Sequence, residues 1–430
     1  MRVTTLVSSA VLFAINLLTG CTHMPTNPPL VASRFAAIDT AIESFITRRQ
    51  MPGAVFWLER SGASYHKAYG RRTFDSAAEA MDLGTVFDAA SLTKVVATAP
   101  AVMLLIEEGK VGLDAPWIQY FPECSGGGKE SISVRHLLTH TSGLAAGLPA
   151  APPWRGEDAA FKLACEQNVT HAPGTFFRYS DINFILLGLL VKRASGQPLD
   201  EFAAQRLFGP LKMQQTGFLP RERPPAAKRA HIAPTQKMID RSAQTLHADL
   251  MQGEILQGVV HDPTIRFMGG VGGSAGLFTT AGDLARFARM MLNDGALDGV
   301  HVLSRESVRL MSSVQSPVAA GWRRSAGWDI DSPYSRPRGS VFPIGSYGHT
   351  GFTGCILWID PFSKTFYVFL SNRVYPGDQA NILGLYSMLG TLAAQAVAGF
   401  DFKQVAGALP ARPVPAAPPP ALPLPPVPLR

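Results

Sequence analysis

Several features that define specialised protein classes are scarce in this chain. Only 17% of its 430 residues are charged, there are four cysteines, and no repeat of fixed period is visible. The cysteines beyond Cys21 are odd in number, so at most one pair can form, and we interpret Cys124, Cys165 and Cys355 as structural or free. With 46% hydrophobic residues the chain can bury a sizeable core, and its length and composition predict one large folded domain.

Charge of either sign is too sparse to indicate a nucleic-acid partner. The formal net charge is +7, or +6 without residues 1–20, whose only charged residue is Arg2. Part of this excess lies in residues 221–229, where no aromatic residues alternate with the basic ones as they do in proteins that bind single-stranded nucleic acid. We therefore predict no nucleic-acid partner. An anionic envelope surface or plain solvation of the loop fits this segment better.

A metal-binding pattern is also missing. His136 and His140 are four residues apart, which on a helix places two ligands on one face. No acidic third ligand follows at a telling spacing. We therefore predict no metal, and we interpret both histidines as structural.

Long hydrophobic runs are absent at the N-terminus as well. The apolar run from Leu6 to Leu18 is too short to span a membrane. Because it follows Arg2 and precedes Leu-Thr-Gly-Cys21, residues 1–20 are interpreted as a secretory signal peptide. The cleavage box resembles the bacterial lipoprotein signal, in which Cys21 becomes lipidated. The alternative is a plain signal peptide with an incidental cysteine.

The two ends of the chain are predicted to lie outside the folded domain. Residues 21–34 contain three prolines and read as a tether that follows the lipidated cysteine. Residues 401–430 end in a stretch of Pro, Ala and Leu that has no periodicity, which predicts an extended, disordered tail. The predicted location is the periplasmic side of the bacterial cell envelope, held to the membrane through the N-terminal lipid.

What the chain does have is a Ser-x-x-Lys run, Ser91 to Lys94, at the start of an apolar stretch. On a helix this spacing places the hydroxyl and the amine on one face, one turn apart. A serine hydroxyl needs a neighbour to take its proton, and lysine can do so when burial or positive charge lowers its pKa. Apolar residues at helical spacing through Ile106 predict a buried helix that opens to a cleft at its N-terminus and is kinked by Pro100.

Two downstream elements complete a three-part pattern. The first is Tyr179-Ser180-Asp181, and the second is His349-Thr350-Gly351. A tyrosine in a loop beside the serine can share its proton with the lysine, and a short strand entered through Thr-Gly can close the other wall of the cleft.

At this point the chain resembles the serine beta-lactamase-related hydrolases, which include class C beta-lactamases, D-alanyl-D-alanine carboxypeptidases and several esterases. The resemblance covers residues 35–398. Besides the three elements above, it rests on residues 133–144, 173–196, 210–218 and 269–295. The resemblance implies an acyl-enzyme mechanism without a metal or an organic cofactor.

Carried over residue by residue, the resemblance makes Ser91 the acylated nucleophile and Lys94 with Tyr179 the groups that move its proton. It implies an oxyanion hole formed by the backbone N–H groups of Ser91 and Phe352, because rigid backbone donors are aimed at the developing charge. It assigns substrate-binding roles to Asp181, His349, Thr350 and Gly351.

Two positions depart from the lactamase pattern. His349 stands where the typical class C lactamase has lysine. Histidine at this position is the form seen in some carboxypeptidases and esterases of the family. Asp181 stands where asparagine is usual, and an ionised aspartate can only accept hydrogen bonds. If Asp181 faces the cleft, it can pair with Lys94 and keep that lysine charged. Alternatively, it caps the helix that starts at Ile182.

A second candidate nucleophile is Ser274, in the Gly-x-Ser-x-Gly run over residues 272–276. Its partners, in the order of an α/β-hydrolase, would be Asp329 or Asp331 and then His349. That motif needs a helix at the serine, whereas residues 277–279 read as a strand and the helix starts near Thr280. We therefore favour Ser91 and expect these glycines to allow a close backbone approach near the cleft.

His261 and Asp262 remain open between two interpretations. They resemble the Val-His-Asp element of one branch of the family and would then line the cleft. The alternative is a structural histidine and aspartate in a loop.

The predicted fold is α+β, an αβα sandwich of the beta-lactamase/transpeptidase type within residues 35–400. Helices are predicted over 35–49 and 381–398, and strands over 53–60, 64–70, 275–279, 354–359 and 366–371. Strands at both ends imply one antiparallel sheet with a helical subdomain inserted over roughly 91–260. The active site should lie at their junction, with His349 supplied by the edge strand.

The sequence thus predicts a serine hydrolase that works through an acyl-enzyme. The leading substrate is a cell-wall D-Ala-type peptide or a beta-lactam amide. A first alternative is a carboxylic ester of a small acyl group, which tolerates the changes at Asp181 and His349. A second alternative is a catalytically inactive envelope lipoprotein that binds its ligand.

Overall fold

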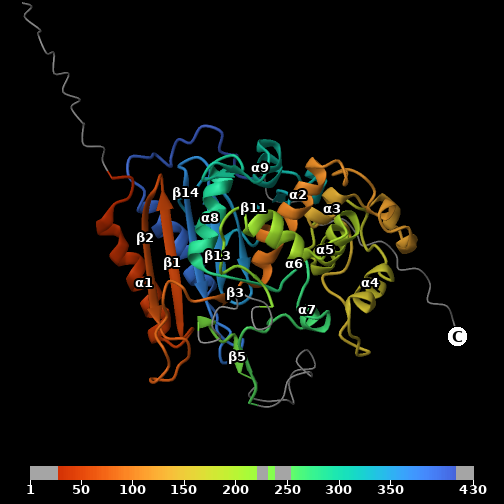
Figure 1. The fold of residues 1–430 in the computed structure, drawn as a ribbon. Coiled ribbons are helices and arrows are strands. Elements are labelled where there is room, and N and C mark those ends of the chain that lie inside the picture. Colours follow the sequence, from red (N-terminus) through yellow and green to blue (C-terminus); the bar gives the residue numbers. More distant parts are fainter. Residues whose placement is uncertain (1–27, 220–230, 238–252, 413–430) are drawn as a thin grey trace, which may run out of the picture.

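The computed structural model describes residues 28–219, 231–237 and 253–412 (Figure 1). The predicted signal peptide, Cys21, the first part of the predicted tether and the basic segment 221–229 lie outside the described residues.

The two ends of the chain build one seven-stranded antiparallel sheet, in the order β10-β11-β12-β13-β14-β1-β2. The N-terminal strands are β1 (Gly53–Arg60) and β2 (Ala63–Gly70). The C-terminal strands are β10 (Arg323–Arg324), β11 (Asp329–Asp331), β12 (Tyr347–Gly351), β13 (Cys355–Asp360) and β14 (Thr365–Ser371). The prediction that both ends share one sheet is confirmed.

Helices cover both faces of the sheet. α1 (Phe35–Thr47) and α10 (Leu383–Gln395) pack on one face, and α8 (Ala281–Leu292) packs on the other (Figure 1). Side chains alternate along β1, so Phe56 joins the apolar cluster of α1 and α10 while Val55 joins the opposite cluster. The predicted αβα sandwich is therefore confirmed.

Helical sequence fills most of the chain between the two halves of the sheet. At its centre α2 (Ala99–Glu107) packs against α5 (Asp181–Ser195), whose buried residues run from Ile182 to Val191. The shorter helices are α3 (Val134–Leu138), α4 (Glu157–Cys165), α6 (Leu199–Ala203), α7 (Pro263–Phe267) and α9 (Arg305–Ser312).

The helix that follows the Ser-x-x-Lys run is a core element. Ala90–Glu107 is long and apolar enough to cross a membrane, yet 83% of it is buried inside the domain. A π-helical turn over Lys94–Thr98 precedes α2, and Pro100 lies in the first turn of α2; the kink at Pro100 stays a prediction. Proline lacks the backbone donor that would continue a regular helix.

Two strand predictions are corrected. The strand predicted at 275–279, β7 (Leu277–Thr279), lies outside the main sheet and pairs with β3 (Phe87–Asp88) and β4 (Gly217–Phe218). Likewise, β12 is not an edge strand, because β11 and β10 continue the sheet beyond it. β10 and β11 are two and three residues long, too short to show the alternation from which strands are predicted. The remaining short strands are β5 (Gln236–Lys237), β6 (Ile255–Leu256), β8 (Ala296–Leu297) and β9 (Val300–His301).

The segments next to the domain are more ordered than the sequence predicts. Within residues 28–34, which are predicted to be part of a tether, the N–H of Val31 donates to the carbonyl that follows α10, at 2.8 Å. Within residues 401–412, predicted to begin a disordered tail, the Arg412 Nε donates to the Asp331 carboxylate at 2.8 Å. Specific polar partners on the domain, which composition cannot reveal, hold both segments.

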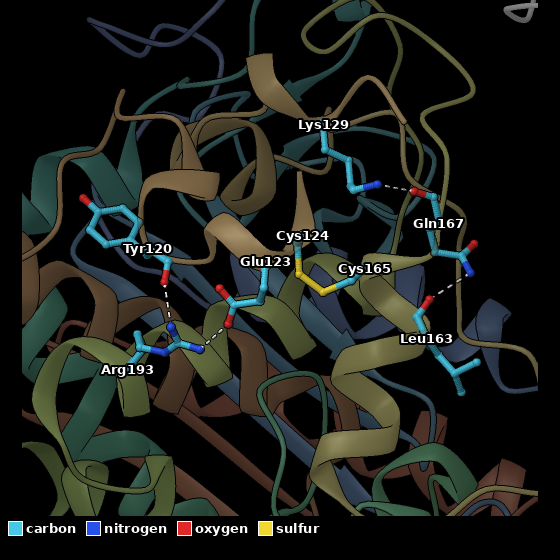
Figure 2. The surroundings of a disulfide bond; sticks show 8 residues. All are labelled: Tyr120, Glu123, Cys124, Lys129, Leu163, Cys165, Gln167 and Arg193. Atoms are coloured by element: carbon cyan, nitrogen blue, oxygen red, sulfur yellow. Dashed lines mark hydrogen bonds and ion pairs between the residues drawn. A yellow bond between two sulfur atoms is a disulfide. The ribbon is translucent and has the colours of Figure 1, made fainter. Parts of the chain in front are cut away.

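A disulfide ties two parts of the helical region together (Figure 2). It joins Cys124 to Cys165 at the end of α4, across 41 positions of sequence. Cys355 is buried and free. One pair and one free thiol is the outcome that the odd cysteine count allows. Two polar links flank the bridge in Figure 2, from Lys129 Nζ to the Gln167 carbonyl at 2.9 Å and from Arg193 to Glu123 at 2.7 Å.

Replacing both bridged cysteines with serine is expected to lower the free energy of unfolding by about 2 to 4 kcal/mol, because the open chain regains the entropy of a long loop. Urea denaturation measures this loss. A thiol reductant should reproduce it in the parent protein and leave the double variant unchanged. Equal stability of the oxidised parent and the variant would contradict a stabilising role for the bridge.

Candidate active site

Ser91 lies in a strained turn that a buried carboxylate holds in place. Ala90, the preceding residue, has φ +46°, a region uncommon for residues that carry a Cβ. The two oxygens of Asp88 accept from the N–H groups of Ala90 at 2.9 Å and His261 at 2.7 Å. Burial raises the pKa of Asp88 to about 6. This single side chain therefore fixes the serine turn and connects it to the loop that contains His261 and Asp262.

Lys94 is fully buried beneath Ser91 and is surrounded by oxygen partners. Its Nζ donates to the Ser91 Oγ at 3.0 Å and to the Ser274 carbonyl at 2.8 Å, and it lies 2.7 Å from the Asp181 carboxylate. The Tyr179 side chain is a further hydrogen-bond partner of this ammonium. The Ser-x-x-Lys spacing thus places hydroxyl and amine in direct contact, as predicted.

The charge state of Lys94 is decided by Asp181. Burial lowers the pKa of Lys94, but the carboxylate of Asp181, helped by Tyr179, raises it by more, so that the net pKa lies above the ordinary value. The lysine is therefore an ammonium at neutral pH. The alternative that Asp181 caps a helix is wrong: α5 begins at Asp181 itself, Ser180 is its N-cap, and no side chain caps it.

Replacing Asp181 with asparagine is expected to release Lys94 from this ion pair. Burial should then lower the pKa of Lys94 relative to the parent protein, with only the contribution of Tyr179 still acting to raise it. If neutral Lys94 is the base, the limb on which kcat/KM rises with pH moves to lower pH by the same amount, as a pH series with an activated ester will measure. An unmoved limb would assign proton removal to Tyr179 instead.

The raised pKa of Lys94 also makes the stability of the fold depend on pH. Because the folded-state pKa of Lys94 is raised, the ion pair stabilises the fold throughout the range below the ordinary lysine pKa. That contribution disappears only as the pH rises through the raised value. Asp181→Asn should therefore be less stable than the parent protein at neutral pH, and the difference should shrink in strong alkali.

Tyr179 stands between aromatic rings and two cations. Its ring stacks on His140 at 4.4 Å between centroids and contacts Tyr334 at 5.3 Å. The Lys94 Nζ lies 5.0 Å from the ring centroid, and the Arg324 guanidinium carbon lies 5.9 Å from it. The tyrosine is thus fixed beside the ammonium that contacts Ser91.

His349 lies on β12 and is neutral. Burial, together with Arg324 and Lys94, lowers its pKa well below the ordinary value. Its Nδ1 is 2.8 Å from the carbonyl of Thr350, so Nδ1 carries the proton and donates. The Nε2 of the neutral ring is left as an acceptor, which suits an incoming N–H or O–H group rather than a carboxylate.

These residues surround a cavity of about 290 Å³ at the junction of the sheet and the helical region. It is lined by Ser91, Tyr179, Asp181, Asp262, Arg324, Asp329, Tyr334, His349, Thr350 and Phe352. Gly351, also predicted, does not line it. A Cβ at Gly351 would lie 2.5 Å from the Ala89 carbonyl, so this glycine allows β12 to approach the serine turn closely.

Three cavity residues were absent from the sequence prediction of the leading site: Arg324, Asp329 and Tyr334. Arg324 and Asp329 are buried, and their charged atoms lie 3.4 Å apart. They belong to β10 and β11, and Tyr334 follows β11. An ion pair across two very short strands has no local sequence signature, so only the assembled sheet reveals it.

A beta-lactamase family model matches residues 38–387 of this chain. An Escherichia coli (strain K12) protein, provisionally named a D-alanyl-D-alanine carboxypeptidase, is 30% identical over 67% of this chain and 69% of its own length. The chain belongs to the beta-lactamase family of serine hydrolases. A Bacillus subtilis (strain 168) protein named N-acetylmuramyl-L-alanine amidase is 30% identical, over 78% of this chain and 80% of its own length.

Solved structures of lower identity share the fold. The hydrolase EstCE1, described as having promiscuous acyltransferase activity, superposes with a TM-score of 0.66 at 19% identity, over 84% of this chain and 98% of its own. Simvastatin synthase from Aspergillus terreus superposes with a TM-score of 0.64 at 21% identity, over 85% of this chain and 96% of its own. Both likenesses support the predicted beta-lactamase/transpeptidase-like fold.

Ser274, the second candidate nucleophile, does not line the cavity as Ser91 does. Its side chain is buried, and its carbonyl serves as an acceptor for Lys94. A Cβ at the neighbouring Gly273 would lie 1.9 Å from the Phe184 carbonyl, so the glycine lets this loop run directly against α5. The close backbone approach predicted for these glycines is confirmed.

The two histidines considered as metal ligands each bind backbone instead. The His136 ring caps α3 by accepting from the Ser133 N–H at 3.2 Å. The His140 ring accepts from the Ser180 N–H at 3.1 Å, while its face supports Tyr179. Within residues 28–219, 231–237 and 253–412, no group of three or more His, Cys, Asp or Glu side chains is placed to hold a metal ion.

Proposed function

We propose that this beta-lactamase-family hydrolase cleaves its substrate through an acyl-enzyme on Ser91. The observation that carries the proposal is the 3.0 Å contact between the Ser91 Oγ and the Lys94 Nζ at the wall of the cavity. A nucleophile in contact with a group that can manage its proton is the requirement for covalent catalysis by serine.

In this mechanism Lys94, Asp181 and Tyr179 act together on the proton. Lys94 rests as an ammonium, so it must first give up a proton before it can accept one from Ser91. The Asp181 carboxylate, 2.7 Å from the Nζ, is placed to take that proton, and Tyr179 is fixed beside the same ammonium. Once Lys94 is neutral, the Ser91 oxygen can attack the carbonyl while its proton passes to the lysine. The tetrahedral intermediate then collapses: the bond to the leaving amine or alcohol breaks, and that group takes the proton from Lys94, while the acyl group stays on Ser91. Water attacks the acyl-enzyme next and passes a proton to Lys94, and the Ser91 oxygen takes this proton back as the acid is released.

The proposed oxyanion hole consists of the backbone N–H groups of Ser91 and Phe352. Ser91 lies at the N-terminal turn of a buried helix, and Gly351 brings the backbone before Phe352 against that turn. Backbone donors fixed in this way stabilise the charge of the tetrahedral intermediate, each typically by about a hundredfold to a thousandfold in rate. Thr350 lines the cavity beside them and is proposed to bind the substrate, together with His349.

The leading substrate is a cell-wall peptide ending in D-alanine, or a beta-lactam that mimics it. The names of two relatives, a D-alanyl-D-alanine carboxypeptidase and an N-acetylmuramyl-L-alanine amidase, support this choice. A second candidate is a carboxylic ester. The observation that favours an ester is the ion pair of Asp181 with Lys94. Asp181 stands where asparagine is usual, and an ionised aspartate cannot donate a hydrogen bond to a substrate amide as asparagine can.

Intact mass spectrometry separates these candidates. The purified protein is mixed with a penicillin and, separately, with a short-chain p-nitrophenyl ester. A lasting penicilloyl adduct on Ser91 supports a penicillin-binding peptidase, and rapid turnover of penicillin supports a lactamase. Fast ester cleavage without an adduct favours the esterase. No reaction with either would overturn the hydrolase and favour a binding protein.

We also propose that the protein is anchored in the cell envelope through a lipid on Cys21, on the basis of the cleavage box that ends there. Replacing Cys21 with serine is expected to move the protein from the membrane fraction to the soluble fraction. Metabolic labelling with a fatty acid should disappear in the same variant. An unchanged distribution would contradict the anchor.

A further inference from the structure

We propose that Asp262 selects substrates whose acyl part carries a cationic amino group. This deepens the proposed function and rests on it, because it assigns a substrate class to the same cavity.

Among the described residues that line the cavity, one carboxylate forms no ion pair. Three carboxylates line it, and they belong to Asp181, Asp262 and Asp329. Asp181 pairs with Lys94 at 2.7 Å, and Asp329 lies 3.4 Å from Arg324. The neutral ring of His349 adds no positive charge. Among the residues that the structure describes, no lysine or arginine lies within ion-pair distance of Asp262.

The groups packed around Asp262 do not remove the charge of its carboxylate. Its electrostatic neighbours are the carboxylates of Asp181 and Asp88 and the cations Lys94 and Arg266. Lys94 is engaged with Asp181, and the Arg266 guanidinium donates to the carbonyl groups of Val260 and His261.

One oxygen of Asp262 is used by the fold and the other is available to a ligand. Its Oδ1 accepts from the N–H of Ile265 at 2.9 Å and caps α7. This leaves Oδ2 for the cavity that the residue lines. Burial, and then the charge of Asp181, raise the pKa of Asp262 to about 6. The carboxylate is therefore ionised at neutral pH, but burial and repulsion by Asp181 make this charged form less favourable than it is in water. An ammonium placed there relieves that repulsion and forms a charge-assisted hydrogen bond.

The position of Asp262 relative to the nucleophile is fixed. The N–H of the adjacent His261 and the N–H of Ala90 are bound by the same buried carboxylate, that of Asp88. One rigid link, the Asp88 carboxylate, therefore holds both the segment whose carboxylate would bind the amino group and the turn whose serine attacks the carbonyl. A discriminating contact needs such a link, because a mobile loop would bind charged and neutral acyl groups alike.

The test uses pairs of activated esters that differ only by an ammonium in place of a methyl group. One pair is the p-nitrophenyl ester of D-alanine and that of isobutyric acid. The second, with a longer arm, is the ester of 6-aminohexanoic acid and that of heptanoic acid. The variant is Asp262→Asn, which keeps an oxygen to cap α7 but has no charge. A matched control is Asp298→Asn, a half-exposed aspartate that pairs with Arg286 away from the cavity.

For at least one pair, the ratio of kcat/KM for the ammonium ester to that for its neutral partner is expected to fall about tenfold or more in Asp262→Asn. Asp298→Asn should leave the ratio at the parent value. Asp262→Ser, which also caps α7, should repeat the effect and so separates charge from local structure. Unchanged ratios in both pairs, with neutral esters still cleaved and Ser91 acylated, would overturn the inference alone. Failure to cleave or to acylate with any of the esters would overturn the proposed function as well.

Discussion

Replacing Ser91 with alanine is expected to abolish acyl-enzyme formation and to lower kcat by at least about ten thousandfold, because the bond that holds the acyl group can no longer form. The structure leaves no second hydroxyl in the same position: Ser91 is the serine that lines the cavity and contacts Lys94 among the described residues. Labelling with a serine-directed phosphonate, followed by intact mass spectrometry, measures the adduct directly.

The matched control is Ser274→Ala. Its hydroxyl is buried and its backbone carbonyl, which remains in the variant, is the group that binds Lys94. Labelling should therefore persist in Ser274→Ala. Labelling that survives in Ser91→Ala and is lost in Ser274→Ala would reject the Ser-x-x-Lys assignment in favour of the Gly-x-Ser-x-Gly motif.

Removing the charge of Arg324 is expected to destabilise the protein by about 3 to 5 kcal/mol, because it leaves a buried carboxylate without its cation. Asp329 is 1% exposed, its nearest cation is Arg324 at 3.4 Å, and burial already raises its pKa. The hydroxyl of Ser335 donates to this carboxylate but carries no charge. Urea denaturation of Arg324→Met measures the loss.

The double variant Arg324→Met with Asp329→Leu serves as the control, because it removes both charges together. Such replacements of a buried pair by apolar residues are often close to neutral, so the double variant should recover most of the lost stability. If the single and double variants are equally unstable, the loss comes from packing of the arginine stem and not from the unpaired carboxylate.

Much of the site was predictable from the sequence because its motifs are local. Ser91 and Lys94 are one helical turn apart, and their contact follows from helix geometry alone. Tyr179 and His349 were predicted from short motifs, and the structure places both at the cavity. The hydrophobic pattern of β1 and β2, with the turn between them, was equally clear.

The direction of Asp181 could not be predicted in the same way. Aspartate suits a helix N-terminus and an ion pair equally well, and the choice depends on whether a cation lies nearby. The fold places the buried Lys94 at 2.7 Å, and this contact decides both the direction of the side chain and the charge of the lysine. Likewise, the choice between a structural and a cleft role for Asp262 was open until the loop was seen at the cavity wall.

The sequence by itself determined the family, the αβα architecture and the candidate nucleophile, because these depend on periodicity and on motifs within a few residues. Only the tertiary structure decided which charges meet. Asp88 with His261, Lys94 with Asp181 and Arg324 with Asp329 are the pairs that shape the cavity. They are joined across separate helices, strands and loops. The interaction between two charges depends on their distance and burial in space, and neither quantity is written in the order of the residues.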